Sequence, residues 1–67
     1  MIEPKHCKCG CTDIDIEEGY EDRHGVYVCL VGCLDWECDE DVLSFSFVSA
    51  EDAREKAINK WNRRMSE

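Results

Sequence analysis

Thiol and imidazole side chains gather at two places in this chain of 67 residues. The first place is the run His6-Cys7-Lys8-Cys9-Gly10-Cys11, and the second is the pair Cys29 and Cys33. Zinc prefers such ligands, and many structural zinc sites take four of them from two turns, each turn supplying a closely spaced pair. The two places therefore predict the two halves of one metal site.

The spacing of these residues favours one set of four ligands. Two residues separate His6 from Cys9, three separate Cys29 from Cys33, and 19 lie between Cys9 and Cys29, as is typical of zinc ribbons. Gly10 follows Cys9 at the point where the backbone must turn so that its amides face a thiolate. We predict one structural Zn²⁺ ion held by His6, Cys9, Cys29 and Cys33, with Cys7 as the alternate ligand.

Other uses of the cysteines stay open. Cys7 and Cys9 are separated by one residue and would close too tight a ring, but Cys7 with Cys11 is sterically possible. Cys38 can replace Cys33 if its loop folds back; otherwise Cys38 and Cys11 are free thiols. Disulfides are the alternative to a metal, and a reducing compartment disfavours them. An enzyme is not expected, because four protein ligands leave a metal no open position for water.

The length and the N-terminus indicate the class of protein. A chain of 67 residues has room for one domain, residues 1–67, and a core this small usually needs a metal or cross-links to be stable. Residues 1–5 precede no apolar run of the kind found in a signal peptide, and no segment is long enough to cross a bilayer. We expect a soluble, intracellular protein.

The periodicity of the chain predicts a small α+β fold in which three antiparallel strands are packed by one C-terminal helix. Strands are expected at about 12–17, 26–31 and 42–48, with a hairpin loop over 18–25. In the last strand Leu43, Phe45 and Phe47 share one face, and Val42, Ser44, Ser46 and Val48 share the other.

A helix is predicted at about 50–64. Ser49 is a typical N-cap with Asp52 three residues later, and acidic and basic side chains suit the first and last turns respectively. An apolar stripe that includes Trp61 should cover the sheet, and the indole N–H of Trp61 should find a carbonyl.

Charge is distributed unevenly along the chain. Residues 1–52 hold 14 acidic and 3 basic residues, a net charge of −11, whereas residues 53–67 have a net charge of +3. Such an acidic body repels phosphate, so direct nucleic-acid binding is not expected and a basic or DNA-binding protein is the better partner. Trp36 can anchor a partner on an acidic surface. The predicted partner-binding residues are Asp35, Trp36, Glu37, Asp39, Glu40 and Asp41.

Several motifs together resemble the Lar family of phage and prophage restriction-alleviation proteins. These are Cys9-Gly10-Cys11, Tyr27-Val28-Cys29, Gly32-Cys33 and, most specifically, the ending Ala57-Ile58-Asn59-Lys60-Trp61-Asn62-Arg63-Arg64. The resemblance implies a zinc-ribbon-like accessory protein in the bacterial cytoplasm. It also implies relief of type I restriction of unmodified DNA, by action on a subunit of the restriction-modification enzyme.

The chain departs from the family at the two turns that would hold the metal. The family usually has Cys-Pro-x-Cys-Gly, where this chain has His6 and an additional Cys7, and the second pair has three intervening residues rather than two. Two alternative functions stand beside the resemblance. A rubredoxin-like iron site would carry electrons, and a zinc-ribbon module would bind nucleic acid through Arg63 and Arg64.

Overall fold

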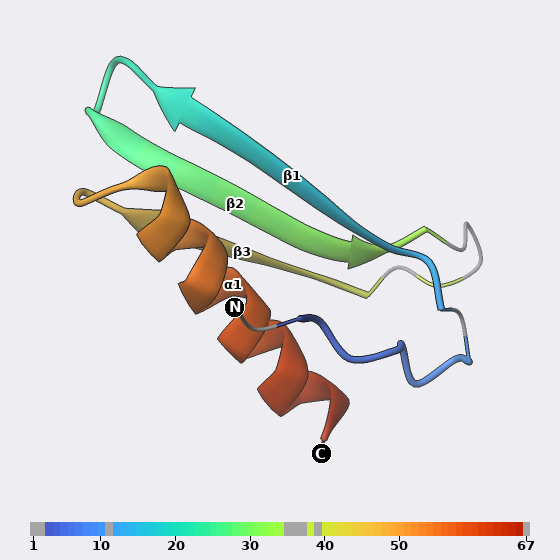
Figure 1. Ribbon diagram of the computed structural model, residues 1–67. Coiled ribbons are helices and arrows are strands. Elements are labelled where there is room, and N and C mark those ends of the chain that lie inside the picture. Colours follow the sequence, from blue (N-terminus) through green and yellow to red (C-terminus); the bar gives the residue numbers. More distant parts are fainter. Residues whose placement is uncertain (1–2, 11, 35–37, 39, 67) are drawn as a thin grey trace.

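The computed structural model describes residues 3–10, 12–34, 38 and 40–66 of the chain. Three strands form one antiparallel sheet in the order β1-β2-β3, and a C-terminal helix packs on one face of it (Figure 1). The elements are β1 (Ile14–Glu21), β2 (Val26–Cys33), β3 (Asp41–Ser46) and α1 (Ala50–Met65). The predicted small α+β architecture is confirmed.

The first hairpin is longer than the sequence predicted. We expected a loop over residues 18–25, but β1 continues to Glu21 and pairs with β2 up to Val26. Gly19 lies opposite Val28, and a Cβ at position 19 would come within 3.3 Å of the Val28 side chain. A glycine that would normally signal a loop therefore lies inside a strand, at a close cross-strand approach. The turn is completed by Gly25, at a φ of 61°.

The helix covers the face of the sheet that carries Cys29 and Val31 of β2 and Val42 of β3. These residues pack with the apolar stripe of α1, and Trp61, Ala53 and Ala57 are wholly buried. Within β3 the predicted alternation is confirmed, and Val42 rather than Phe45 faces the core. The strand ends at Ser46 instead of 48, and Val48, which was predicted to share the face of Val42, is 79% exposed. Leu43, Phe45 and Phe47 are exposed.

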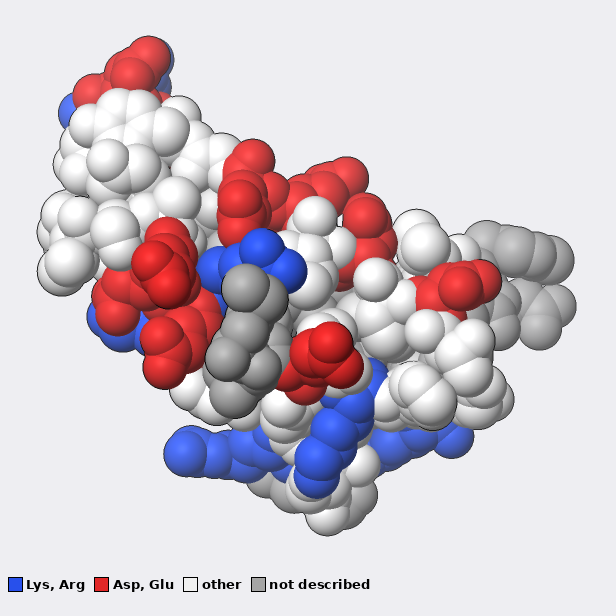
Figure 2. Space-filling model, in the orientation of Figure 1, with Lys and Arg blue, Asp and Glu red and all other residues white. Residues whose placement is uncertain are grey.

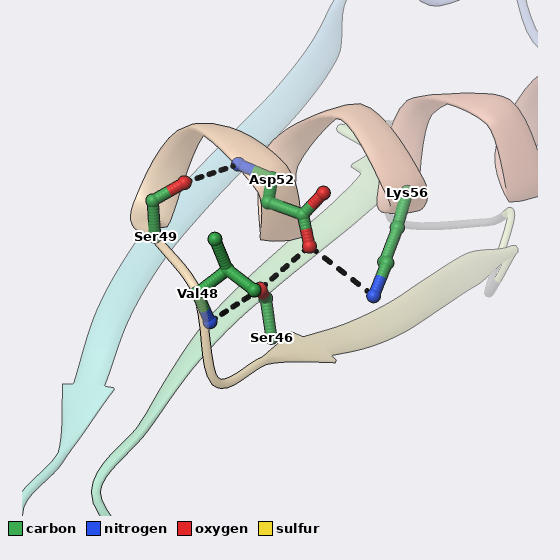
Figure 3. Close-up of polar contacts among 5 residues, drawn as sticks. All are labelled: Ser46, Val48, Ser49, Asp52 and Lys56. Carbon is green, nitrogen blue, oxygen red and sulfur yellow. Dashed lines mark hydrogen bonds and ion pairs between the residues drawn. The ribbon is translucent and has the colours of Figure 1, made fainter.

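The start of the helix is built as the sequence predicted (Figure 3). The Ser49 side chain accepts a hydrogen bond from the Asp52 backbone N–H over 3.1 Å. The Ser46 hydroxyl donates to the Asp52 carboxylate over 2.6 Å, and Lys56 pairs with the same carboxylate. The hydrogen bond from Ser46 and the pairing with Lys56 lower the pKa of Asp52. The end of β3 is thereby fixed to the first turns of α1.

Candidate metal centre

Four cysteine sulfurs lie together at one end of the sheet. They belong to Cys7, Cys9, Cys33 and Cys38, and all lie within 4.8 Å of one another. The shortest separations are 3.4 Å between Cys7 Sγ and Cys38 Sγ, and 3.7 Å between Cys9 Sγ and Cys33 Sγ. Cys7 is buried, Cys33 and Cys38 are half-buried, and Cys9 is exposed.

These separations fit a tetrahedral metal ion. Zinc binds thiolates at about 2.3 Å, so the edge between two sulfurs of a tetrahedral site is about 3.8 Å. The observed separations of 3.4 and 3.7 Å lie near that edge. Sulfur movements of less than about 1 Å therefore suffice for all four thiolates to contact one ion. These four residues would hold the metal. Cys7 and Cys9 precede β1, Cys33 ends β2, and Cys38 lies between β2 and β3.

The first two sulfurs come from a tight turn that precedes β1. The Gly10 backbone N–H donates to the Cys7 carbonyl over 2.9 Å, and Gly10 has a φ of 96°. A left-handed φ favours glycine, as the sequence predicted for this position. The turn places the Cys7 and Cys9 sulfurs in the same group. The expectation that one intervening residue is too few for these two thiols to act together is therefore not met.

The end of α1 holds this turn in place. The Trp61 indole N–H donates to the Lys5 carbonyl over 2.9 Å, which confirms the predicted carbonyl partner for that side chain. The Asn62 side chain accepts from the Lys5 backbone N–H over 2.7 Å. The Lys8 backbone N–H lies 3.3 Å from the Met65 sulfur. Three residues on the last two turns of the helix thus fix the backbone around Cys7.

The other two sulfurs come from the connection between β2 and β3. Cys33 ends β2, and its backbone N–H donates to the Glu40 carbonyl over 3.1 Å. The Glu40 carboxylate pairs with Arg64 of α1 over 2.6 Å. These contacts close the connection and bring Cys38 back beside Cys33. Cys38 lies in the same group as Cys33, so it joins Cys33 rather than replacing it, as the alternative had supposed.

The structure differs from the expected ligand set at two positions. Of His6, Cys9, Cys29 and Cys33, it brings together Cys9 and Cys33, with the alternate ligand Cys7, whereas His6 and Cys29 are not in the group. Cys29 and Cys33 both lie in β2, and four residues of extended strand span about 13 Å. One metal ion cannot bind both. A pair with three intervening residues requires a turn, and the chain is straight there.

The surroundings of Cys29 favour its neutral form. Burial raises the pKa of Cys29, the nearby Glu18 carboxylate raises it further, and Arg54 opposes them. A neutral thiol packed beside Val31 in the core is the result. Metal ligation requires thiolates instead. Cys29 therefore contributes to packing.

Cys7 has the opposite tendency. A hydrogen bond from the Cys9 backbone lowers the pKa of Cys7, and this outweighs the opposing effect of burial. For Cys38 the Glu40 backbone lowers the pKa, but the hydrogen bond to Cys7 and burial together raise it. The Cys7 and Cys38 sulfurs are 3.4 Å apart, and either thiol can donate to the other. A metal ion would bind these sulfurs as thiolates.

The N-terminal turn that carries Cys7 and Cys9 lies against the C-terminal end of α1. Lys and Arg side chains gather around this end of the helix, and acidic patches and a few further basic side chains lie elsewhere on the visible face (Figure 2). Zinc bound by four thiolates has a net charge of −2. Positive charge in its surroundings stabilises that charge.

No protein-family model, curated protein or solved structure matches this chain. The resemblance to the Lar family stays a prediction. Among the described residues, no helix is both long and apolar enough to cross a membrane.

The predicted partner-binding segment is only partly described. Asp35, Trp36, Glu37 and Asp39 lie outside the described residues, as does Cys11. Of the rest, Glu40 pairs with Arg64, and Asp41 is exposed at the start of β3.

Proposed function

We propose that this protein is a non-catalytic accessory protein whose fold is held by one structural zinc ion and whose surface binds a host protein. The observation that carries the metal part is the group of four sulfurs within 4.8 Å of one another. Four thiolates complete the coordination of zinc, so they leave no position for a substrate or water. When bound, the ion supplies cross-linking: it joins the N-terminal turn to the β2–β3 connection.

The partner part is supported by charge. The chain has 16 acidic and 8 basic residues, and an acidic surface attracts basic proteins while it repels nucleic acid. A type I restriction-modification subunit is the proposed partner, in keeping with the resemblance to restriction-alleviation proteins. The protein would then reduce cleavage of unmodified DNA by binding the enzyme.

The metal is tested by elemental analysis of the protein purified without added metal. One equivalent of zinc in a colourless protein is expected, and chelation should lower the melting temperature, because metal binding contributes to folding free energy. Cobalt substitution should give the spectrum of an all-sulfur tetrahedral site. A protein that holds no metal and melts identically with and without chelator would refute this part.

The partner is tested with a purified type I enzyme and unmodified DNA. Added protein should reduce cleavage and bind the enzyme in a salt-sensitive way, without binding the naked duplex. The Cys38→Ser variant, which lacks one proposed ligand and should be less stable, shows whether binding depends on the intact fold. Tight binding to duplex DNA at physiological salt, with no binding to the enzyme, would contradict the proposal.

An iron site is the second candidate, and one observation favours it. The predicted ligand His6 is not in the group, and the four grouped ligands are all sulfur. Four thiolates suit iron as well as zinc. A red protein with one equivalent of iron would establish this alternative and, with it, an electron-transfer role.

A further inference from the structure

The face of the sheet opposite α1 carries an apolar surface. It is formed by Val28 and Leu30 of β2 and by Leu43 and Phe45 of β3, which we call the open face. Leu43 is 44% exposed and Phe45 is 53% exposed. A sheet usually buries its apolar side chains against another layer, as this sheet does beneath α1. Within the described part of the chain, the open face has no such layer.

The strand register orders this surface into rows. Leu30 pairs with Leu43 and lies opposite Glu17 of β1, and Val28 pairs with Phe45 and lies opposite Gly19. Each row therefore has two apolar side chains on β2 and β3, and an acidic or absent side chain on β1. The result is an apolar strip along β2 and β3.

One end of the strip is acidic on both sides. Gly32 of β2 lies between Asp15 of β1 and Asp41 of β3. A Cβ at position 32 would come within 3.1 Å of the Asp41 Cβ, which is closer than an ordinary contact, and glycine leaves this space without a side chain. Two carboxylates consequently flank a bare stretch of backbone, about 10 Å apart across two strand spacings. That space suits the cationic end of a lysine or arginine side chain.

We infer that the open face binds a basic amphipathic helix of a partner protein. The apolar side of that helix would cover Leu30, Leu43, Val28 and Phe45, as α1 covers the other face. Its lysine or arginine side chains would pair with Asp15, Glu17 and Asp41. This inference deepens the proposed partner-binding function, because it names the surface and the chemistry of the partner.

Charge argues against a second copy of the chain as the occupant. The formal net charge is −8, and a symmetric pairing of open faces would bring acidic rims towards each other. Like charges at close range are unfavourable in such an interface. A basic partner removes this repulsion and makes its encounter with the face faster at low salt.

The test uses the zinc-loaded full chain and three synthetic peptides. One is an amphipathic helix of leucine and lysine, the second has glutamate in place of lysine, and the third has the first composition in scrambled order. We expect only the first to bind, with amide NMR shifts confined to β2, β3 and the facing rim of β1. Equal binding of the scrambled or the acidic peptide, or shifts on α1 instead, would overturn the inference.

Variants test the two parts of the surface separately. Phe45→Ser should weaken binding by about 30-fold, the loss typical of an interface hot spot. The matched control is Val48→Ser, which changes a 79% exposed side chain outside the sheet and should leave binding unchanged. Asp15→Asn combined with Asp41→Asn should weaken binding and reduce its salt dependence. Circular dichroism spectra establish that each variant is folded, and the amide shifts of the unsubstituted chain test the surface without any substitution.

Two outcomes separate this inference from the function on which it rests. If the unsubstituted chain binds the restriction enzyme and Phe45→Ser binds it equally well, the surface is wrong and the function stands. If the unsubstituted chain binds neither enzyme nor basic peptide, the proposed partner binding fails as well. A dimer in sedimentation equilibrium that Phe45→Ser dissociates would show that a second copy occupies the face, and would overturn the inference.

Discussion

Replacing Cys38 with serine removes one sulfur from the group and tests its composition directly. The Cys7 and Cys38 sulfurs are 3.4 Å apart, and all four sulfurs of the group lie within 4.8 Å. An ion that contacts the other three sulfurs therefore contacts Cys38 too. Cys38→Ser should leave a site with three thiolates and a weaker fourth ligand.

A lower bound can be placed on the loss of zinc affinity in Cys38→Ser. Removing an outer-shell partner of a metal ligand typically costs about 10–100-fold in affinity, or about 1.4–2.7 kcal/mol. A ligand itself should cost more than the upper of these values. Structural zinc contributes about 10–16 kcal/mol in small zinc domains, and this binding energy is also folding energy. The variant should therefore bind zinc more than about 100-fold more weakly and melt at a lower temperature.

Two variants provide matched controls, because they change residues that were predicted as ligands from spacing and that lie outside the group of sulfurs. Cys29→Ala removes one heavy atom from a fully buried side chain, which should cost about 0.5–1.5 kcal/mol, as in Ile→Val substitutions. It should retain one equivalent of zinc. His6→Ala changes an exposed side chain and should retain both the zinc and the melting temperature.

The assay is competition for zinc with a chromophoric chelator, followed by cobalt substitution. The unsubstituted chain, His6→Ala and Cys29→Ala should share one all-sulfur cobalt spectrum, and Cys38→Ser should differ. The reasoning is refuted if Cys29→Ala or His6→Ala releases the metal while Cys38→Ser holds it with unchanged affinity.

Three further predictions concern the contacts that hold the elements together. Trp61→Phe removes the hydrogen bond to the Lys5 carbonyl and part of a wholly buried side chain; urea unfolding should show a loss of about 1–3 kcal/mol. Ser49→Ala removes the N-cap and should lower the free energy of unfolding by about 1 kcal/mol, whereas Ser49→Asp should retain most of the stability that the cap contributes. The lowered pKa of Asp52, which accepts from Ser46, contributes stability that is present above the unfolded value of 3.8 and is lost as the pH falls through the folded value. Asp52→Asn should therefore reduce stability at neutral pH and flatten its decline at acidic pH; an unchanged acid titration would contradict this role.

The fold was predictable because its local signals agree with one another. Alternation in the three strands, the Ser49 cap and the apolar stripe with Trp61 each indicate the same element that tertiary packing stabilises. The exception is Gly19, where a residue typical of loops lies in a strand. Cross-strand proximity to Val28 explains that exception, and such proximity is not visible before the register is known.

The metal centre was predictable only in part, because ligand spacing was counted without the geometry of the chain between ligands. The run Val26–Val31 already indicated a strand that includes Cys29, and a strand extended to Cys33 separates the two thiols by about 13 Å. That signal was present in the sequence. The position of Cys38 beside Cys33 was not indicated by the sequence. It depends on contacts that Glu40 makes with Cys33 and Arg64, and these contacts are known only from the structure.

The proposed metal and the open face depend on the same strand pairing. Cys33 ends β2, and Gly32, which lies between Asp15 and Asp41, precedes it. An ion that binds Cys33 and Cys38 closes the connection at the point where β3 begins, and so fixes which residue of β3 lies beside Gly32. A shift of one residue in that pairing would turn Leu43 and Phe45 towards α1. The ion would therefore specify the proposed partner surface as well as stabilise the fold.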